Sequence, residues 1–185
     1  GIYVAGLAGG PANNSVISNN LVRTYCSAAS SSCYGITLQN NANWNNITGN
    51  YVNVSGTTTN NGIYLAGTNL LSVDSNLIDS NAIQSLGIVG AGGANNYGIY
   101  ITSNSSRNTV TWNNITTNGT SGNHGIYLNG PALNTATNNN SISNNIVQTY
   151  GNVSNNSVTN YGIYIWNQAN QNNITYNNVS AYGTT

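Results

Sequence analysis

Apolar residues recur along this chain in two short blocks, which are separated by stretches rich in Asn, Gly, Ser and Thr. The first block reads Gly-Ile-Tyr, or Gly-Ile-Thr in one copy, and an aliphatic residue follows it. The second reads aliphatic-x-x-Asn-x-aliphatic, and its Asn is never replaced. The first block occurs at 1–3, 35–37, 62–64, 98–100, 125–127 and 162–164, and the second at 17–22, 47–52, 78–83, 110–115, 142–147 and 174–179.

Both blocks predict short β-strands, because Ile, Val, Tyr and Thr alternate with polar residues and are bounded by turn-forming residues. No segment has the 3.6-residue apolar period of a helix. The constant Asn residues are separated by 30, 31, 32, 32 and 32 positions, so each copy fits one coil of a stack. Stacked coils bury an apolar column that no single coil buries alone. The pattern predicts an all-β fold, a right-handed parallel β-helix (β-solenoid) of about six coils.

The spacing of the Gly-Ile-Tyr blocks indicates that the repeating unit is a pair of coils. These blocks are separated alternately by 34, 27, 36, 27 and 37 positions, which gives a unit of about 63 residues. We therefore interpret the chain as a single solenoid domain, 1–185, with repeat units at about 1–61, 62–124 and 125–185. It is either a complete subunit or a window of a longer repetitive polypeptide.

The constant Asn has a structural explanation in a solenoid. Asn tolerates the left-handed backbone of tight turns, and its amide both donates and accepts hydrogen bonds. Amides stacked in register can bond along a ladder and satisfy groups that would otherwise be buried without partners. The predicted ladder consists of Asn20, Asn50, Asn81, Asn113, Asn145 and Asn177.

With these blocks the whole chain resembles the right-handed parallel β-helix repeat family of secreted and surface proteins. That family includes secreted polysaccharide-active enzymes, periplasmic maturation factors and microbial surface proteins. The resemblance implies a fold and no single activity, because the scaffold hosts many functions. The polysaccharide lyases and hydrolases of that fold work with clustered acidic residues plus Lys or Arg, and this sequence departs from them.

Charged residues make up only 2% of the chain, against roughly 25% in typical globular proteins. Asp74 and Asp79 are five positions apart and could form an acid/base pair, but Asp79 stands where other coils have Ser or Thr, which favours an ordinary structural role. His124 has no acidic or Cys neighbour with which to hold a metal. We therefore expect no enzymatic activity, no catalytic or metal site and no cofactor.

Zero net charge also argues against two classes of partner. Nucleic acids and anionic membranes attract clustered Lys and Arg, which this chain lacks. No apolar run is long enough for a membrane-spanning helix. We expect neither nucleic-acid binding nor membrane insertion.

Cys26 and Cys33 lie seven positions apart in one loop. Two thiols in a chain of secreted character most simply pair, so a local disulfide is expected, with free thiols as the alternative. Such a bond would staple a loop and would not carry out redox chemistry.

A row of tyrosines is the best candidate binding site in the sequence. Because side chains alternate along a strand, the Tyr of each Gly-Ile-Tyr block should lie opposite the buried Ile. The row either binds sugar rings or stacks on itself and stiffens the wall. It consists of Tyr3, Tyr64, Tyr100, Tyr127 and Tyr164, with Thr37 as the exception.

Covalent glycans are expected on this surface. Asn-x-Ser/Thr sequons are numerous, but the abundance of Asn, Ser and Thr makes their number weak evidence. The stronger reason is that a surface with almost no charge lacks the usual protection against association, which glycans would supply. The favoured loop sites are Asn53, Asn118, Asn152 and Asn155.

The two ends of the sequence are close to being in phase. The chain starts at a Gly-Ile-Tyr block, and its tail, 179–185, matches 52–58 and 115–121, so copies joined head to tail would continue the repeat. Repeated head-to-tail contact generates a filament. The favoured function is a structural subunit of an extracellular or cell-surface filament, stalk or surface layer. The alternative is a carbohydrate-binding or adhesive module that uses the tyrosines, and a polysaccharide-active enzyme ranks third.

Overall fold

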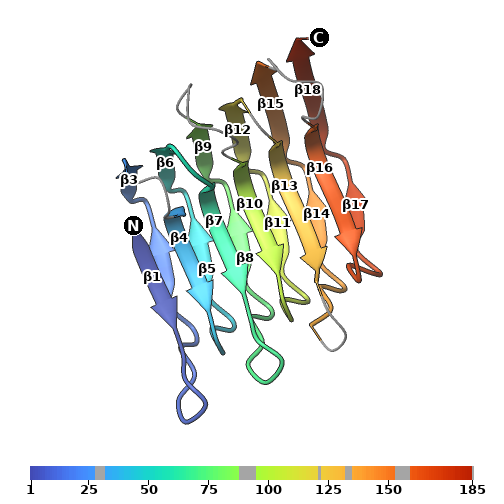
Figure 1. The fold of residues 1–185 in the computed structure, drawn as a ribbon. Coiled ribbons are helices and arrows are strands. Elements are labelled where there is room, and N and C mark those ends of the chain that lie inside the picture. The colour runs from blue at the N-terminus through green and yellow to red at the C-terminus, as the bar shows by residue number, and fades with distance from the viewer. Residues whose placement is uncertain (28–31, 88–94, 121, 132–134, 153–158, 185) are drawn as a thin grey trace.

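The computed structural model describes residues 1–27, 32–87, 95–120, 122–131, 135–152 and 159–184. These residues form eighteen β-strands, arranged as three parallel six-stranded sheets. Each coil contributes one strand to every sheet, and the coils stack along one axis with the N- and C-terminal coils at opposite ends (Figure 1). The predicted all-β parallel solenoid of about six coils is confirmed.

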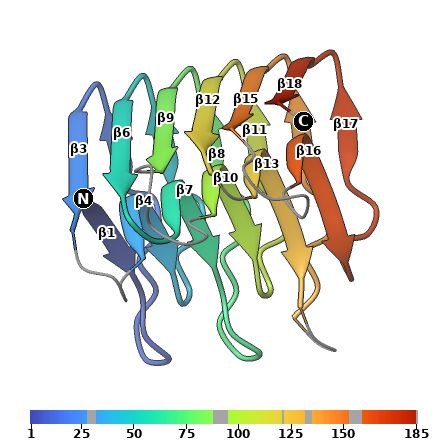
Figure 2. The ribbon, with the colours of Figure 1, turned by 45° about the horizontal axis from the view of Figure 1, so that its top comes forward.

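The first sheet contains the Gly-Ile-Tyr blocks. Its strands, in spatial order, are β1 (Ile2–Ala5), β4 (Cys33–Gln39), β7 (Asn60–Ala66), β10 (Asn96–Thr102), β13 (Asn123–Gly130) and β16 (Asn160–Asn167). The second sheet contains three-residue strands: β2 (Val16–Ser18), β5 (Asn46–Thr48), β8 (Leu77–Asp79), β11 (Thr109–Thr111), β14 (Ser141–Ser143) and β17 (Asn173–Thr175). The third sheet, in front in Figure 2, contains β3 (Leu21–Cys26), β6 (Tyr51–Gly56), β9 (Ala82–Gly87), β12 (Asn114–Gly119), β15 (Ile146–Asn152) and β18 (Asn178–Thr184).

The second sequence block forms two strands in each coil, whereas its pattern predicts one. In the fourth coil, Val110 lies on β11 and Ile115 on β12, with a corner between them. The two residues are five positions apart, so on one continuous strand they would face opposite sides. Both are fully buried, and the corner makes this possible because Trp112 adopts a left-handed backbone with φ 55°.

Aliphatic side chains in register fill the space between the three sheets. Ile99 pairs with Ile63 in the preceding coil and with Ile126 in the following one, and all three are fully buried. Each Ile is therefore buried against the Ile of the neighbouring coil, and full burial of one Ile side chain contributes about 1.5–3 kcal/mol to the stability of the fold. None of the described residues forms a helix, so none forms a helix that could cross a membrane.

The block glycines after the first coil allow the first and third sheets to approach closely; they are Gly35, Gly62, Gly98, Gly125 and Gly162. A Cβ atom at Gly125 would overlap Val147 Cγ1 and would lie 2.6 Å from the carbonyl oxygen of Gly162 in the next coil. Any larger residue would push these two sheets apart. The repeat therefore requires glycine at this position, just as it requires the apolar isoleucine that follows.

The predicted asparagine ladder is present, and its four inner members, Asn50, Asn81, Asn113 and Asn145, are buried. Asn113 is representative: its Nδ2 donates to the carbonyl oxygens of Ile78 and Thr111, both at 2.9 Å, and to Asn145 Oδ1 at 3.0 Å. Its Oδ1 accepts from the backbone N–H and the Nδ2 of Asn81, at 3.0 and 2.9 Å. One side chain therefore satisfies polar groups from three coils, which explains why it is never replaced. The left-handed backbone offered as a second explanation was wrong, because it belongs to the preceding residue, Trp112 in this coil.

Two further polar ladders, which the sequence analysis missed, run beside the predicted one at the corners of the second sheet. One lies five positions earlier and consists of Asn45, Asn76, Asn108, Asn140 and Asn172. The other lies seven positions earlier and consists of Asn13, Asn43, Asp74, Ser106, Asn138 and Asn170. Both ladders could have been found in the sequence, because their members always lie five or seven positions before a constant Asn.

Candidate functional site

The tyrosines predicted to form a row do form a column on the outer face of the first sheet. Neighbouring coils pair these residues directly, in the order Tyr3, Thr37, Tyr64, Tyr100, Tyr127 and Tyr164. We call this set the tyrosine column. Between Tyr100 and Tyr127, and between Tyr127 and Tyr164, the ring centroids are 4.9 and 5.0 Å apart and the planes are within 9° of parallel. At these positions the ring faces lie against each other.

A second column of side chains runs beside the first and makes the aromatic face wider than the sequence predicted. It consists of Tyr34, Asn61, Tyr97, His124 and Tyr161, which precede the glycines. We call it the flanking column. Tyr97 and Tyr100 both face outward although they are three positions apart, because Gly98 and Ile99 between them are both buried. The Tyr97 and Tyr100 ring centroids are 4.9 Å apart.

His124 is the most enclosed titratable group of the aromatic face, with only 6% of its surface exposed. Its ring stacks between Tyr97 and Tyr161, at 5.5 and 5.4 Å, and meets Tyr127 and Tyr164 edge-on. Burial lowers the pKa of His124 to about 4, because desolvation disfavours the charged imidazolium. Burial likewise raises the pKa of Tyr97 to about 12. This face is therefore uncharged over a wide pH range.

The tyrosine column is interrupted at one position, Thr37. Threonine is shorter than the phenol that the other coils carry here, and a cavity of about 290 Å³ is open beside it, across the first two coils. The residues around it are Gly1, Ile2, Tyr3, Tyr34, Thr37 and Gln39. We call this cavity the Thr37 notch.

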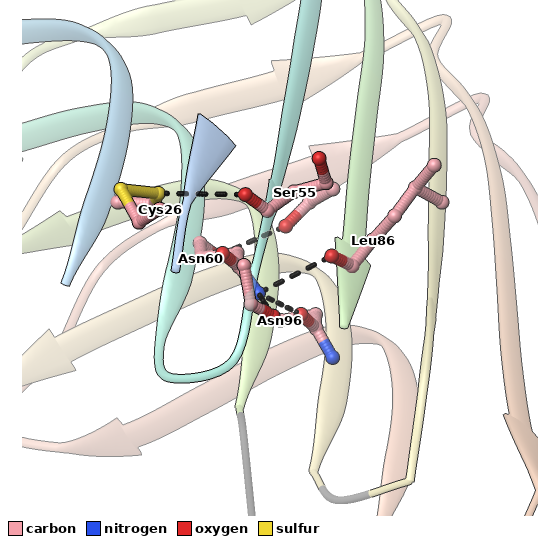
Figure 3. Close-up of a disulfide and its surroundings, with 8 residues drawn as sticks. Cys26, Ser55, Asn60, Leu86 and Asn96 are labelled. Carbon is pink, nitrogen blue, oxygen red and sulfur yellow. Dashed lines mark hydrogen bonds between the residues drawn. A yellow bond between two sulfur atoms is a disulfide. The ribbon is translucent and has the colours of Figure 1, made fainter. Parts of the chain in front are cut away.

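Cys26 and Cys33 are joined by a disulfide at the start of another polar ladder (Figure 3). Cys33 pairs in register with Asn60, and Cys26 with Gly56. In the next coil the Asn60 Nδ2 donates to the Gly56 carbonyl at 3.2 Å, so a hydrogen bond closes the same loop that the disulfide closes covalently. The ladder continues through Asn60, Asn96, Asn123 and Asn160.

The charged residues considered as candidate catalytic groups have structural partners. Asp74 is buried in the ladder that begins at Asn13, where its Oδ1 accepts the Ser106 N–H at 2.8 Å. Its Oδ2 forms an ion pair with Arg107. Asp79 accepts a hydrogen bond from Ser80 Oγ at 3.0 Å. Within the described residues, no three His, Cys, Asp or Glu side chains gather at a place where they could hold a metal.

Three of the four candidate glycosylation sites lie on strands of the third sheet. Asn118 is exposed on β12, whereas Asn53 is half-buried on β6 and donates to Gln84 Oε1 at 3.3 Å. Asn152 ends β15, and Asn155 lies outside the described residues. Glycosylation of these four residues stays a prediction.

No protein-family model matches the sequence, and no characterised protein was found to be related to it. Among solved structures, the fold is similar to the crystal structure of an alginate lyase from Paenibacillus sp. str. FPU-7. The match covers 99% of this chain and 85% of the lyase, with 14% identity and a TM-score of 0.31.

The comparison contradicts one sequence-based expectation. We expected no enzymatic activity because the chain has so few charged residues, but the matching structure is that of an enzyme, so that exclusion is withdrawn. A TM-score of 0.31 is too low to carry an argument for any activity, substrate or active site of this chain.

Proposed function

We propose that this protein is a structural element of an extracellular or cell-surface filament, stalk or surface layer, in which β-solenoid coils stack end to end. The observation that carries the proposal is the direction of the ladder hydrogen bonds. In the predicted ladder, the backbone N–H and Nδ2 of each Asn donate to Oδ1 of the Asn in the following coil, as Asn50 does to Asn81. Along this ladder each Asn therefore presents its Oδ1 to the preceding coil and its backbone N–H to the following coil, whereas in the ladder that begins at Asn13 the N–H groups donate to the preceding coil, as Asn43 does to Asn13.

This direction is the same along the whole ladder. Asn20 donates to Asn50, and Asn145 donates to Asn177, at distances of 2.9–3.0 Å. The next donors in the series are the N–H and Nδ2 of Asn177, and the next acceptor is Oδ1 of Asn20. A further coil of the same kind, from the same polypeptide or from another copy, would meet complementary groups at either edge. Along this ladder, a coil in the reverse direction would place donors against donors or acceptors against acceptors.

The strand edges support the same arrangement. Within the described part of the chain, β1, β2 and β3 pair on one side only, as do β16, β17 and β18. Unpaired parallel edges recruit further strands of matching register. Because one edge carries β1, β2 and β3 and the other β16, β17 and β18, the contact is heterologous, and heterologous contacts that do not close into a ring produce filaments. The partner in this proposal is the protein itself, head to tail.

Substituting Asn177 tests the proposal. Asn177→Asp keeps an acceptor for Asn145 but removes the Nδ2 donor and adds a charge at the donor edge. The matched control is Asn178→Asp, which adds the same charge at the adjacent exposed residue outside the ladder. We expect the unmodified protein and Asn178→Asp to form rods by electron microscopy, with an axial diffraction spacing of about 4.8 Å. Asn177→Asp should shorten the rods at equal concentration.

Two results would overturn this function. One is an unmodified protein that stays monomeric by sedimentation at every concentration up to its solubility limit. The other is rods whose length is equally affected by the two Asp substitutions, since that would attribute the effect to charge rather than to the ladder.

A further inference from the structure

The Thr37 notch interrupts an otherwise continuous aromatic surface. Thr37 is paired with Tyr3 on one side and with Tyr64 on the other, and it is only 4% exposed, so it forms the floor of the opening. Farther along the column, successive rings lie about 5 Å apart and cover each other's faces. The notch is therefore the place where this column is open to a ligand.

Two aromatic rings border the notch and remain accessible. Tyr3 is 64% exposed and Tyr34 is 38% exposed. The Tyr34 ring is held by Tyr64, with 5.1 Å between the centroids. A ring fixed in this way offers apolar surface to a ligand with little loss of side-chain entropy.

Polar groups at the rim give the notch a hydrogen-bonding character without side-chain charge. Gln39 Oε1 accepts the Tyr3 hydroxyl proton at 2.9 Å, which fixes the orientation of the Gln39 amide. The amide –NH₂ group then remains as a donor, because Asn and Gln amides carry donors and acceptors on separate atoms. No charged side chain is among the six residues that line the notch.

We propose that the Thr37 notch binds one neutral sugar ring of a polysaccharide or glycan. A pyranose has an apolar C–H face that packs on aromatic rings and a rim of hydroxyls that pair with an amide. The volume of about 290 Å³ is near the lower end of ligand pockets, at about 300 Å³, and fits one ring rather than several. Neutral sugars are favoured over acidic ones because no side-chain cation faces the cavity. The site would attach the proposed rod to a carbohydrate surface, a role beyond the rod itself.

The decisive variant is Thr37→Tyr, which introduces the residue found at this place in the other five coils and fills the notch. It is expected to fold, since the surrounding coils already accommodate tyrosine in register. Binding of neutral hexasaccharides of glucose, mannose and xylose is measured by calorimetry and by NMR shifts of Tyr3, Tyr34 and Gln39. We expect at least one neutral series to bind, Thr37→Tyr to abolish that binding, and Tyr34→Ala to weaken it at least tenfold. Tyr176→Ala, a control at an exposed corner, should change nothing.

Three outcomes would overturn the proposal: no binding of any neutral hexasaccharide at millimolar concentration, unchanged binding by Thr37→Tyr, or preferential binding of uronic-acid oligosaccharides. Rod formation by Thr37→Tyr is measured in parallel. Thr37 does not belong to the asparagine ladder, so Thr37→Tyr should lose sugar binding and still form rods. That result would test the sugar site independently of the proposed function.

Discussion

Acidification should weaken this fold through one side chain of the aromatic face, His124. The residue is only 6% exposed, and its ring neighbours are Tyr97, Tyr127, Tyr161 and Tyr164. Phenols carry no negative charge at acidic pH, so none of them compensates a protonated imidazole. Burial is the larger influence on the pKa of His124, and a backbone contact with Asn123 opposes it only in part.

The size of the effect follows from the two pKa values. His124 has a pKa of about 4 in the folded chain, against 6.5 when unfolded. Between these values the unfolded chain binds a proton and the folded chain does not. Stability is therefore fully present above pH 6.5 and declines as the pH falls, by at most about 1.4 kcal/mol per pH unit. By pH 4 the free energy of unfolding should have decreased by about 3 kcal/mol.

The pKa can be measured directly, because His124 is the only histidine of the chain. The NMR signal of its imidazole should titrate near pH 4, and urea midpoints should fall between pH 7 and pH 4. His124→Asn supplies the matched variant, since Asn61 occupies the corresponding position two coils earlier. In this variant the urea midpoint should be nearly constant from pH 7 to pH 4.5. A histidine signal titrating near pH 6.5, or an equal acid sensitivity of His124→Asn, would refute the reasoning.

Four further variants, two single and two double, test the local energetics by urea denaturation. Asn113→Ala should cost about 3 kcal/mol or more, because it leaves several buried ladder groups without partners; a cost below about 1 kcal/mol would contradict this account. Trp112→Asn should stabilise by about 1 kcal/mol, because Asn tolerates the left-handed corner better than Trp does, and a loss of stability would count against that explanation. Replacing Cys26 and Cys33 by Gly and Asn, as in the later coils, should give a more stable protein than replacing both by Ser. Asn60 Oδ1 is buried without a partner in the described residues, and an Asn at position 33 would donate to it; equal stability of the two double variants would exclude that bond.

The period of the constant Asn was enough to predict the fold and the first ladder. Each copy has the same residue type at the same position of the coil, so the stacking of coils can be read from the spacing of these residues. The corners could not be predicted in the same way. The left-handed residue before each ladder Asn is variously Asn19, Gly49, Ser80, Trp112, Asn144 or Tyr176, and the backbone conformation is shared although the side chains are not.

The aromatic face was predicted only in part for a related reason. The tyrosine column follows from the alternation of a strand, and Tyr64 indeed lies opposite the buried Ile63. Tyr97 and Tyr100 share a face only because the strand departs from alternation at Gly98. That departure depends on close packing of the glycine against Ile115 of the third sheet, a contact that a one-dimensional pattern does not reveal.

Neutral amides, rather than charges, determine how the coils fit together. A slip of one residue in the fourth coil would bring Trp112 to the place of Asn113, and the carbonyl groups of Ile78 and Thr111 would lose their donor. The corner position before the ladder tolerates many residue types, but the ladder position tolerates only Asn, because only its amide bonds across three coils. The same selection would act where one rod end meets another. An end that arrived out of register or reversed would find unpaired donors, so stacking through these edges favours straight rods over disordered aggregates, even in a chain with almost no charge.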